Sequence, residues 1–200
     1  MRIGIDISQV AYEGTGVGNY IKNLVENLIH LDRENEYILF FSSLRRNFQF
    51  SPQGHLSPES GTIFNLQSNA KIKVKQYKLP PTILDLLWNR LHIAPIEWFI
   101  GDVDVFISSD WTQPPTKAKK VTILYDLIVY TYPEETHNKS EFNLRKLLIS
   151  PNIVAAQKRR LYWVKKECDK ILCISKATKK DAMEILRIPE EKLSVIYPGT

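Results

Sequence analysis

A glycine-rich segment near the amino terminus has the residue types best suited to chemistry. An apolar stretch, 2–8, leads into Gly14-Thr-Gly-Val-Gly18, and an amphipathic helix follows at once. A turn of this kind leaves backbone N–H groups at the positive end of the helix dipole, where they can bind an anion. Glycines in such a turn also allow close packing, and the sequence leaves both roles open. The residues that we expect to contact a ligand phosphate are Gly14, Gly16, Val17 and Gly18.

The glycine-rich segment differs from two familiar nucleotide-binding motifs. A dinucleotide fingerprint needs Gly-x-Gly-x-x-Gly and an acidic residue about 20 positions further on. The second predicted strand, 37–41, ends instead in Ser42-Ser43. An ATP-binding loop ends in Gly-Lys-Ser or Gly-Lys-Thr, whereas Gly18 is followed by Asn19-Tyr20. NAD and ATP are therefore disfavoured as ligands.

Polar and aromatic residues follow several of the other predicted strands. In a parallel sheet, ligands bind outside the carboxyl ends of the strands, so we expect these residues to face the same crevice as the glycines. Aromatic rings stack on sugar faces, and carboxylates accept hydrogen bonds from hydroxyls. Tyr125 and Asp126 belong to this set, and Asp126 is equally suited to lining the crevice and to bracing its own loop. The residues expected to bind a sugar or acceptor are Asn19, Trp111, Ser175 and Lys176.

Strands alternate with helices along the rest of the chain, and these elements must position the candidate residues. Short β-branched, apolar runs without a polar face are typical of buried parallel strands. Residues 44–70 are rich in polar residues, show no period and predict a long surface loop. The predicted fold class is α/β, with a Rossmann-like parallel sheet of about seven strands and helices on both faces. The predicted strands are 2–8, 37–41, 72–77, 103–107, 121–124, 171–174 and 193–196.

Apolar residues at helical spacing predict the helices. The second helix is expected to break at Pro95, which has no backbone N–H to donate. The last helix is expected to start at Ser175, whose hydroxyl can cap it. In the second helix, the predicted apolar side is Leu84, Leu87, Leu91 and Trp98. The predicted helices are 17–31, 83–100, 153–167 and 176–186.

Length and composition narrow the class of protein. The chain has 200 residues, 44% of them hydrophobic, which suffices for one domain with a substantial core. No apolar run reaches the roughly 18 to 20 residues that span a bilayer, and no signal peptide precedes the first strand. Cys168 and Cys173 have no histidine nearby, so we expect core thiols in a reducing compartment rather than a metal site. These features predict a cytoplasmic protein.

Positive charge is concentrated on the helix predicted over 153–167. The net charge of the chain is +5, and lysines and arginines of this helix lie opposite Val154, Leu161, Val164 and Cys168. Such a helix suits the anionic inner face of a membrane, and it is also the pattern of a solvated face on a core-packed helix. Nucleic acid is not expected, because no aromatic platform or reading motif accompanies the charge. The basic residues are Lys158, Arg159, Arg160, Lys165, Lys166 and Lys170, of which Lys158, Arg159, Lys165 and Lys166 are the candidates for membrane contact.

Several short motifs occur in a set order along the chain: Gly14-Thr-Gly-Val-Gly-Asn-Tyr20, Asp110-Trp-Thr-Gln-Pro-Pro115, Ile123-Leu-Tyr-Asp-Leu127, Tyr132-Pro-Glu134, Cys173-Ile-Ser-Lys-Ala-Thr-Lys-Lys-Asp181 and Leu193-Ser-Val-Ile-Tyr-Pro-Gly199. Taken together, they resemble the N-terminal half of a family 4 glycosyltransferase (GT4) of the GT-B fold. The resemblance covers nearly the whole chain except residues 44–70. It suggests mannosyltransferase-like enzymes of polysaccharide biosynthesis.

The resemblance implies two Rossmann-like domains that face each other across a cleft. Residues 1–200 would form the N-terminal, acceptor-side domain, and the C-terminal domain that holds most of the nucleotide-sugar would lie outside this chain. The glycine turn would approach the donor diphosphate. A hexose would pass, with retention of configuration, from a GDP- or UDP-linked sugar to a polysaccharide or lipid-linked acceptor. No cofactor and no protein nucleophile are implied, and these residues alone are expected to be inactive.

One substitution within these motifs opens an alternative. The resemblance implies that Tyr125 and Asp126 are the catalytic residues. Family members usually have His-Asp at these two positions, and tyrosine stays neutral near pH 7. A non-catalytic relative that serves as a scaffold or partner protein is therefore the alternative function. A stand-alone flavodoxin-like nucleotide binder is disfavoured, because it would not need the long segment 44–70. For a catalytic relative, Arg159, Arg160 and Lys176 would suit an anionic acceptor such as a lipid-linked phosphate.

Overall fold

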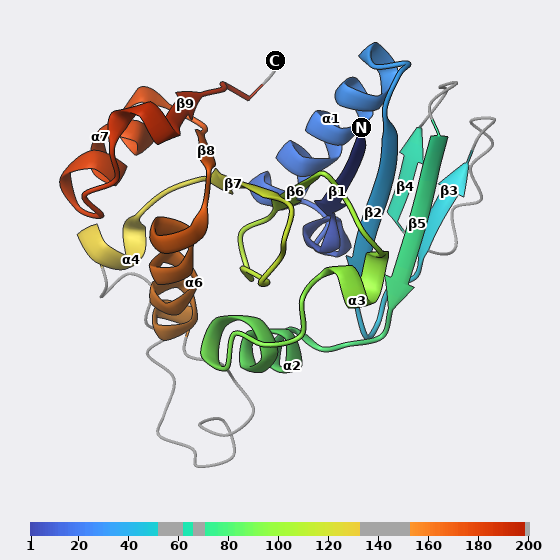
Figure 1. Ribbon diagram of the computed structural model, residues 1–200, viewed down its shortest axis with the longest axis horizontal. Coiled ribbons are helices and arrows are strands. Elements are labelled where there is room, and N and C mark those ends of the chain that lie inside the picture. Colours follow the sequence, from blue (N-terminus) through green and yellow to red (C-terminus); the bar gives the residue numbers. More distant parts are fainter. Residues whose placement is uncertain (52–61, 66–70, 133–152, 199–200) are drawn as a thin grey trace.

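The computed structural model describes residues 1–51, 62–65, 71–132 and 153–198, which form an α/β fold around a parallel sheet (Figure 1). The strands of the main sheet are β1 (Arg2–Asp6), β2 (Glu36–Ser42), β5 (Lys71–Tyr77), β6 (Val105–Ser108), β7 (Lys119–Leu124), β8 (Lys170–Cys173) and β9 (Leu193–Val195). These seven strands lie in the order β5-β2-β1-β6-β7-β8-β9, and every neighbouring pair is parallel. The predicted fold class and all the predicted strands of the sheet are confirmed.

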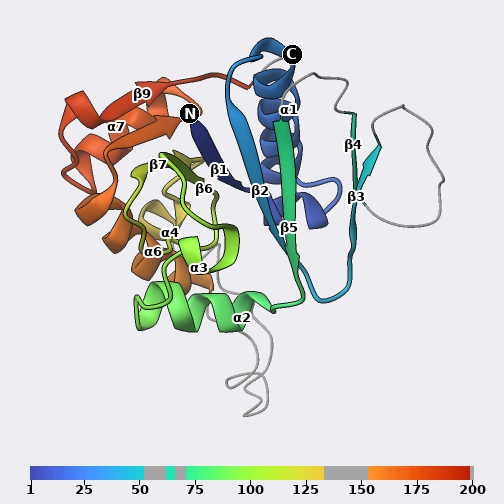
Figure 2. The ribbon, with the colours of Figure 1, turned by 45° about the vertical axis from the view of Figure 1, so that its right-hand side comes forward.

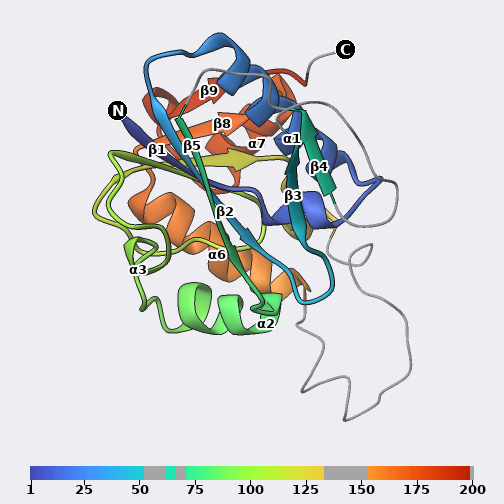
Figure 3. The same ribbon diagram turned by 90° about the vertical axis from the view of Figure 1, so that its right-hand side faces the viewer.

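Helices cover both faces of this sheet. The helical elements are η1 (Ser8–Ala11), α1 (Gly16–Leu31), α2 (Pro81–Leu84), η2 (Asp85–Arg90), α3 (Glu97–Ile100), α4 (Ile128–Thr131), α6 (Ile153–Glu167), α7 (Lys176–Glu184) and η4 (Glu190–Lys192). Figure 3 shows α1 on one side of β1 and β2, with α2, α3 and α6 on the other. The chain therefore builds three layers, with the sheet in the middle.

Strand β2 shows how the sequence holds both outer layers in place. Tyr37, Leu39 and Phe41 belong to the core beneath α1. Ile38 and Phe40 point the other way, into the core shared with α2, η2 and α3. Successive side chains of a strand alternate between faces, so a continuous apolar run buries both faces of the strand.

A further core fills the end of the sheet formed by β7, β8 and β9. Val154, Leu161 and Val164 of α6 are buried there with Cys168, which confirms the predicted apolar face of this helix. Figure 1 shows α4, α6 and α7 grouped around these strands. This packing fixes the loop that joins β7 to α4, where Tyr125 lies.

The helix predicted over 83–100 is interrupted. α2 passes directly into the π-helical segment η2, where the Leu91 amide donates to the Leu86 carbonyl, five residues back, at 3.0 Å. The wider turn shifts the phase of the side chains. Trp88, within η2, is fully buried, whereas Leu91 and Trp98, which were predicted to face the core, are 55% and 77% exposed. The chain returns to a helix only in α3.

Part of the segment predicted as a loop, 44–70, forms strands instead. β3 (Phe48–Ser51) and β4 (Thr62–Asn65) pair in parallel as a separate small sheet, which lies beside α1 in Figure 2. The ring of Phe48 is buried, 5.5 Å from the ring of Phe41. This contact with the main core is tertiary, so the local pattern could not reveal it. The rest of the predicted loop in 52–61 and 66–70 lies outside the described residues.

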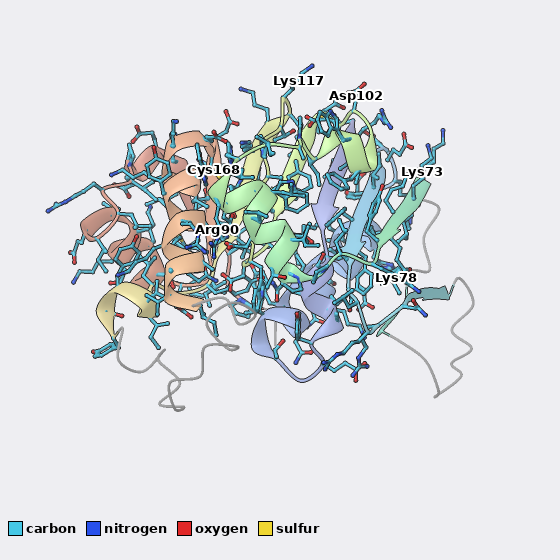
Figure 4. The ribbon with its side chains drawn as sticks, turned by 90° about the horizontal axis from the view of Figure 1, so that it is seen from below. Lys73, Lys78, Arg90, Asp102, Lys117 and Cys168 are labelled. Atoms are coloured by element: carbon cyan, nitrogen blue, oxygen red, sulfur yellow. The ribbon has the colours of Figure 1, made fainter. Side chains whose placement is uncertain are left out.

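The strand order reverses at β1, where β2 and β5 continue on one side and β6 to β9 on the other. In open parallel sheets, ligands bind at such a reversal, outside the carboxyl ends of the strands. Figure 4 shows Asp102 and Lys117, which precede β6 and β7, together at one edge of the molecule and away from Lys78, which follows β5. The segments after β1, β6 and β7 therefore lie at the edge where a ligand is expected.

Candidate functional site

The start of α1 presents backbone amides at this edge of the sheet. Thr15 caps the helix, since its Oγ1 accepts a hydrogen bond from the Gly18 amide at 3.1 Å. The same hydroxyl donates to the Tyr12 carbonyl at 2.7 Å, which fixes its orientation. Within the described residues, the amides of Gly16 and Val17 have no hydrogen-bond partner. They are the first amides of the helix, which is where an external anion can bind.

The glycines of the turn have different roles. Gly14 has φ of +76°, so it supplies a left-handed turn that other residues adopt at a cost. At Gly16, an added Cβ would meet no atom within 4 Å. At Gly18, a Cβ would lie 3.0 Å from the carbonyl oxygens of Gln9 and Tyr12. Gly18 does not have the free amide expected of a phosphate donor, because its amide donates to the cap, and its missing side chain lets α1 approach η1.

A cavity of about 790 Å³ adjoins the start of α1. It lies between α1, the segments that follow β7 and β8, and the chain after β9. Of the residues predicted from the sequence, Gly16, Val17, Asn19, Tyr125 and Asp126 line it together. The lining residues that were not predicted are Tyr20, Asn23, Leu24, Asn27, Ile174, Ile196, Tyr197 and Pro198.

Tyr125 is the buried polar residue of this cavity. Its side chain is 7% exposed, and its ring meets the ring of Tyr20 edge to face at 5.4 Å. Its hydroxyl has no hydrogen-bond partner within the described residues. Burial, with a smaller effect of the nearby Asp110 carboxyl, raises the pKa of Tyr125 above its usual 10. The phenol therefore stays protonated at neutral pH and offers a donor to a ligand.

Asp126 has both of the roles that the sequence left open. Its carboxyl lines the cavity, and its Oδ1 accepts a hydrogen bond from the Ile128 amide at 3.1 Å, which braces the start of α4. The side chain is exposed. Its remaining oxygen is available to a hydroxyl in the cavity.

Two of the missed residues, Asn23 and Asn27, follow a signal that the sequence does contain. With the predicted Asn19 they recur every fourth residue, so the three occupy one edge of α1 beside its apolar stripe. Residues Ile196 to Pro198 enter the cavity only because β9 ends beside β8, and Tyr20 Oη donates to the Ile196 carbonyl at 3.3 Å. No local pattern predicts that contact.

The remaining predicted site residues do not line this cavity. Trp111 borders a separate cavity of about 130 Å³ and stacks on Tyr12 with ring centroids 5.7 Å apart. Ser175 caps α7, as predicted, because its hydroxyl accepts from the Thr178 amide at 3.0 Å. Lys176 is exposed. A direct sugar contact by Ser175 or Lys176 is therefore not supported by their positions.

A buried charge cluster lies near Tyr125, beneath the site. Arg160 is fully buried, and its Nη2 donates to Thr122 Oγ1 at 2.8 Å and to the Ile123 carbonyl at 2.9 Å. Its Nη1 lies 3.6 Å from Asp110 Oδ1. Burial raises the pKa of Asp110 to about 6, against the opposing effect of Arg160, and burial likewise raises the pKa of Asp6. The guanidinium thus compensates two carboxyls that the fold has removed from water.

The burial of Arg160 corrects its assignment to the solvated face of α6. It lies one turn before Val164, on the apolar stripe. Arg159 is also turned inward, with Nη2 at 2.8 Å from Asp85 Oδ2, and Arg90 holds the same carboxyl from η2 at 2.9 Å. Figure 4 shows Arg90 at the junction of η2 and α6. Arg159 is therefore a structural ion-pair residue rather than a membrane-surface residue.

Other basic residues of α6 remain at the surface. Lys165 is exposed, Lys158 Nζ lies 5.1 Å from the ring centroid of Tyr130, and Lys166 Nζ lies 4.9 Å from that of Trp163. Within the described residues, no helix combines the length and apolar character needed to cross a bilayer. The same residues contain no group of three or more His, Cys, Asp or Glu placed to hold a metal ion.

Comparisons with known proteins add no assignment to this geometry. No protein-family model matches the sequence, and no curated protein matches it. The structure defines the class of the chain as an α/β, Rossmann-like domain with a ligand-sized cavity between α1 and the segments that follow β7, β8 and β9.

Proposed function

We propose that this chain is the acceptor-binding half of a retaining glycosyltransferase that transfers a hexose from a nucleotide-sugar. The observation that carries the proposal is the cavity that joins two kinds of donor. Gly16 and Val17, whose amides have no partner within the described residues, line its α1 end, and Tyr125, whose buried hydroxyl is likewise unpaired there, is part of its wall. The first suits a diphosphate, and the second suits a sugar hydroxyl.

In the proposed reaction, the bond between the anomeric carbon and the donor diphosphate breaks as a bond to the acceptor hydroxyl forms. The diphosphate gains negative charge, which the amides and the dipole of α1 would stabilise. The acceptor hydroxyl attacks from the same face and gives its proton to the departing phosphate oxygen. Tyr125 cannot serve as the base, since burial raises its pKa above its usual value. It acts instead by orienting a hydroxyl, so catalysis is mainly positioning.

The proposal requires a second, donor-binding domain. The described cavity has no cationic side chain in its lining, so most contacts to a UDP- or GDP-linked sugar would come from that domain. We also propose peripheral contact with an anionic, inner-face membrane through Lys158, Lys165 and Lys166, at the cytoplasmic side. Such a contact would bring a lipid-linked or growing polysaccharide acceptor near the site.

The decisive experiment compares the chain alone with the chain extended by the coding sequence that follows it. Calorimetry on the 200 residues should give dissociation constants weaker than about 1 mM for UDP- and GDP-hexoses, because few donor contacts are present. The extended protein should transfer labelled hexose to a glycan or lipid extract. Micromolar donor binding to the short chain would contradict the division of roles. An extended protein without transfer activity would contradict the enzyme proposal.

A non-catalytic partner protein is the second candidate function. The observation that favours it is the buried, neutral Tyr125 at the position where related enzymes usually have histidine. A Tyr125→His variant of the extended protein separates the two candidates. If the tyrosine marks lost activity, the variant gains transfer that the parent lacks. If the tyrosine is functional, the parent is active, and the variant has no advantage over it.

A further inference from the structure

The edge of α1 that faces the cavity carries a row of neutral amides. Asn19, Asn23 and Asn27 all line the cavity. Their spacing of four residues makes a row about 12 Å long, which is longer than one pyranose ring. The side-chain amides of Asn19 and Asn23 make no hydrogen bond within the described residues, and Asn27 Nδ2 donates to the Asn23 carbonyl at 2.8 Å. Each free amide offers donors and an acceptor together, as a sugar hydroxyl requires.

A second, independent observation comes from the wall that faces this row. Tyr125 lines the cavity and is more than nine-tenths buried, and its hydroxyl, itself buried from solvent, has no partner within the described residues. A buried polar group without a partner costs free energy, so a ligand that bonds to it gains affinity. Leu24 and Ile174 supply apolar surface nearby. Amides, a phenol and apolar patches together match the alternating hydroxyl and C–H surfaces of a sugar.

Charge decides which sugars fit. Among the described residues, the only charged side chain in the lining is Asp126. The cations that would favour an anionic acceptor are elsewhere: Arg160 is fully buried beside Asp110, and Arg159 pairs with Asp85. An anionic group beside the asparagine row would therefore meet a carboxylate and no neutralising cation.

The geometry points to the asparagine row of α1 as the acceptor-sugar subsite, selective for an uncharged, hydroxyl-rich glycosyl unit over a phosphorylated or acidic one. This inference rests on the proposed function, from which the acceptor role comes, and it deepens that function by naming the class of acceptor. Asn23, in the middle of the row, is the principal specificity residue. The length of the row favours a glycan end of more than one sugar over a monosaccharide.

The test is a nuclear magnetic resonance titration of the 200-residue chain. The side-chain NH2 signals of Asn19, Asn23 and Asn27 are followed as methyl glycosides of glucose, galactose and mannose are added, and then as the matching hexose 6-phosphates are added. We expect at least one methyl glycoside to shift the signals of Asn23 and of one of its neighbours in the row, and its 6-phosphate to bind about tenfold more weakly. The inference is overturned if the phosphate binds as tightly, or if no glycoside shifts these signals.

Variants separate recognition from a structural effect. Asn23→Ala should weaken glycoside binding about fivefold, because ligand hydroxyls lose their partner. The control is His30→Ala, an exposed residue of the same helix outside the lining, which should leave binding unchanged. Alanine is the better helix former in both cases, so neither variant should lose stability. Equal binding by Asn23→Ala and the parent chain would refute the role of the row.

The outcomes also distinguish this inference from the proposed function. If uncharged glycosides bind at the row but the extended protein transfers no sugar, the row is a carbohydrate-binding site and the proposed enzyme activity is contradicted. If the extended protein transfers sugar and Asn23→Ala does not change its apparent affinity for the acceptor, the proposed enzyme activity is supported and the asparagine-row subsite is contradicted.

Discussion

The Thr15 hydroxyl accepts a hydrogen bond of 3.1 Å from the Gly18 amide, and this single contact divides the glycine turn into two parts. Gly18 is bound into the cap. Gly16 and Val17, at the first positions of α1, keep their amides for an external group. The glycine turn therefore combines a packing role and a ligand role, at different residues.

Substituting the two helix glycines should give opposite effects on stability. Gly18→Ala places a Cβ 3.0 Å from two backbone carbonyls, so we expect the free energy of unfolding to fall by about 1 to 3 kcal/mol. Gly16→Ala meets no neighbouring atom, and it should leave stability unchanged or raise it by about 0.5 kcal/mol. Urea denaturation measures both. Equal losses in the two variants would contradict the separate roles.

Removing the Tyr125 hydroxyl should stabilise the chain and weaken ligand binding. The hydroxyl is buried without a partner, so Tyr125→Phe relieves a desolvation cost of about 1 kcal/mol. Thermal unfolding should show a higher Tm. The glycoside that shifts the asparagine signals should bind this variant less tightly than the parent chain. A lower Tm would mean that the hydroxyl has a partner in solution.

Asp110 should make stability depend on pH in mildly acidic solution. Burial raises its pKa to about 6, above the usual 3.8, so between these values the folded protein holds a proton that the unfolded chain has lost. The contribution of Asp110 to the free energy of unfolding is therefore fully present below pH 3.8 and is lost as the pH rises through about 6. The loss is on the order of 2 kcal/mol, because the side chain keeps 23% exposure. Asp110→Asn should flatten the stability curve over this range.

Urea midpoints of the parent chain and of Asp110→Asn, measured at intervals from pH 4 to 7, provide the comparison. Glu34→Gln, at an exposed position, is the matched control and should keep the parent's curve. Curves of the same shape for the parent and Asp110→Asn would show that Asp110 titrates normally.

Arg160 should be needed for stability, because its positive charge compensates the buried carboxyls of Asp6 and Asp110. Arg160→Met leaves the carboxyls of Asp6 and Asp110 without their cation, and we expect a loss of about 3 to 5 kcal/mol near neutral pH. Adding Asp110→Asn to this variant should recover part of the loss, because one buried charge is removed. A double-mutant cycle at neutral pH measures the coupling. Additive effects would show that the 3.6 Å pair has no energetic role.

The surface lysines of α6 should carry any attraction to anionic vesicles. The double variant Lys165→Glu, Lys166→Glu should lower binding to vesicles with anionic lipid on the order of thirtyfold, at about 1 kcal/mol for each lysine lost. The matched control is Lys71→Glu, Lys75→Glu, which makes the same charge change on the edge strand β5. Co-sedimentation measures both. Equal losses would show that net charge, and not this helix, governs binding.

The fold was predictable because its signals are local. The apolar run of β2 and the three- and four-residue spacing in α1 each indicate the element and its buried side. Ser175 indicates the start of α7 by its capping chemistry. The candidate site was partly predictable for the same reason, since residues that follow parallel strands must gather at one edge. Tyr125 and Asp126 therefore lie with Gly16 in one cavity.

The features of the fold and of the candidate site that the sequence did not predict depend on contacts between residues far apart in the chain. The helix predicted over 83–100 is interrupted after η2, and Leu91 and Trp98 are exposed although they were predicted to face the core. Arg160 is buried near the carboxyls of Asp6 in β1 and Asp110 after β6, and no spacing within α6 shows this.

The sequence by itself determined the parallel sheet, the order of its elements and the helix start that can receive an anion, because periodicity, capping and chain direction act over a few residues. The tertiary structure alone decided which glycine packs and which faces the ligand, and it decided that asparagines line the cavity while arginines do not. Those outcomes depend on which surfaces meet across the sheet, and burial of a charge depends on partners far away in the chain.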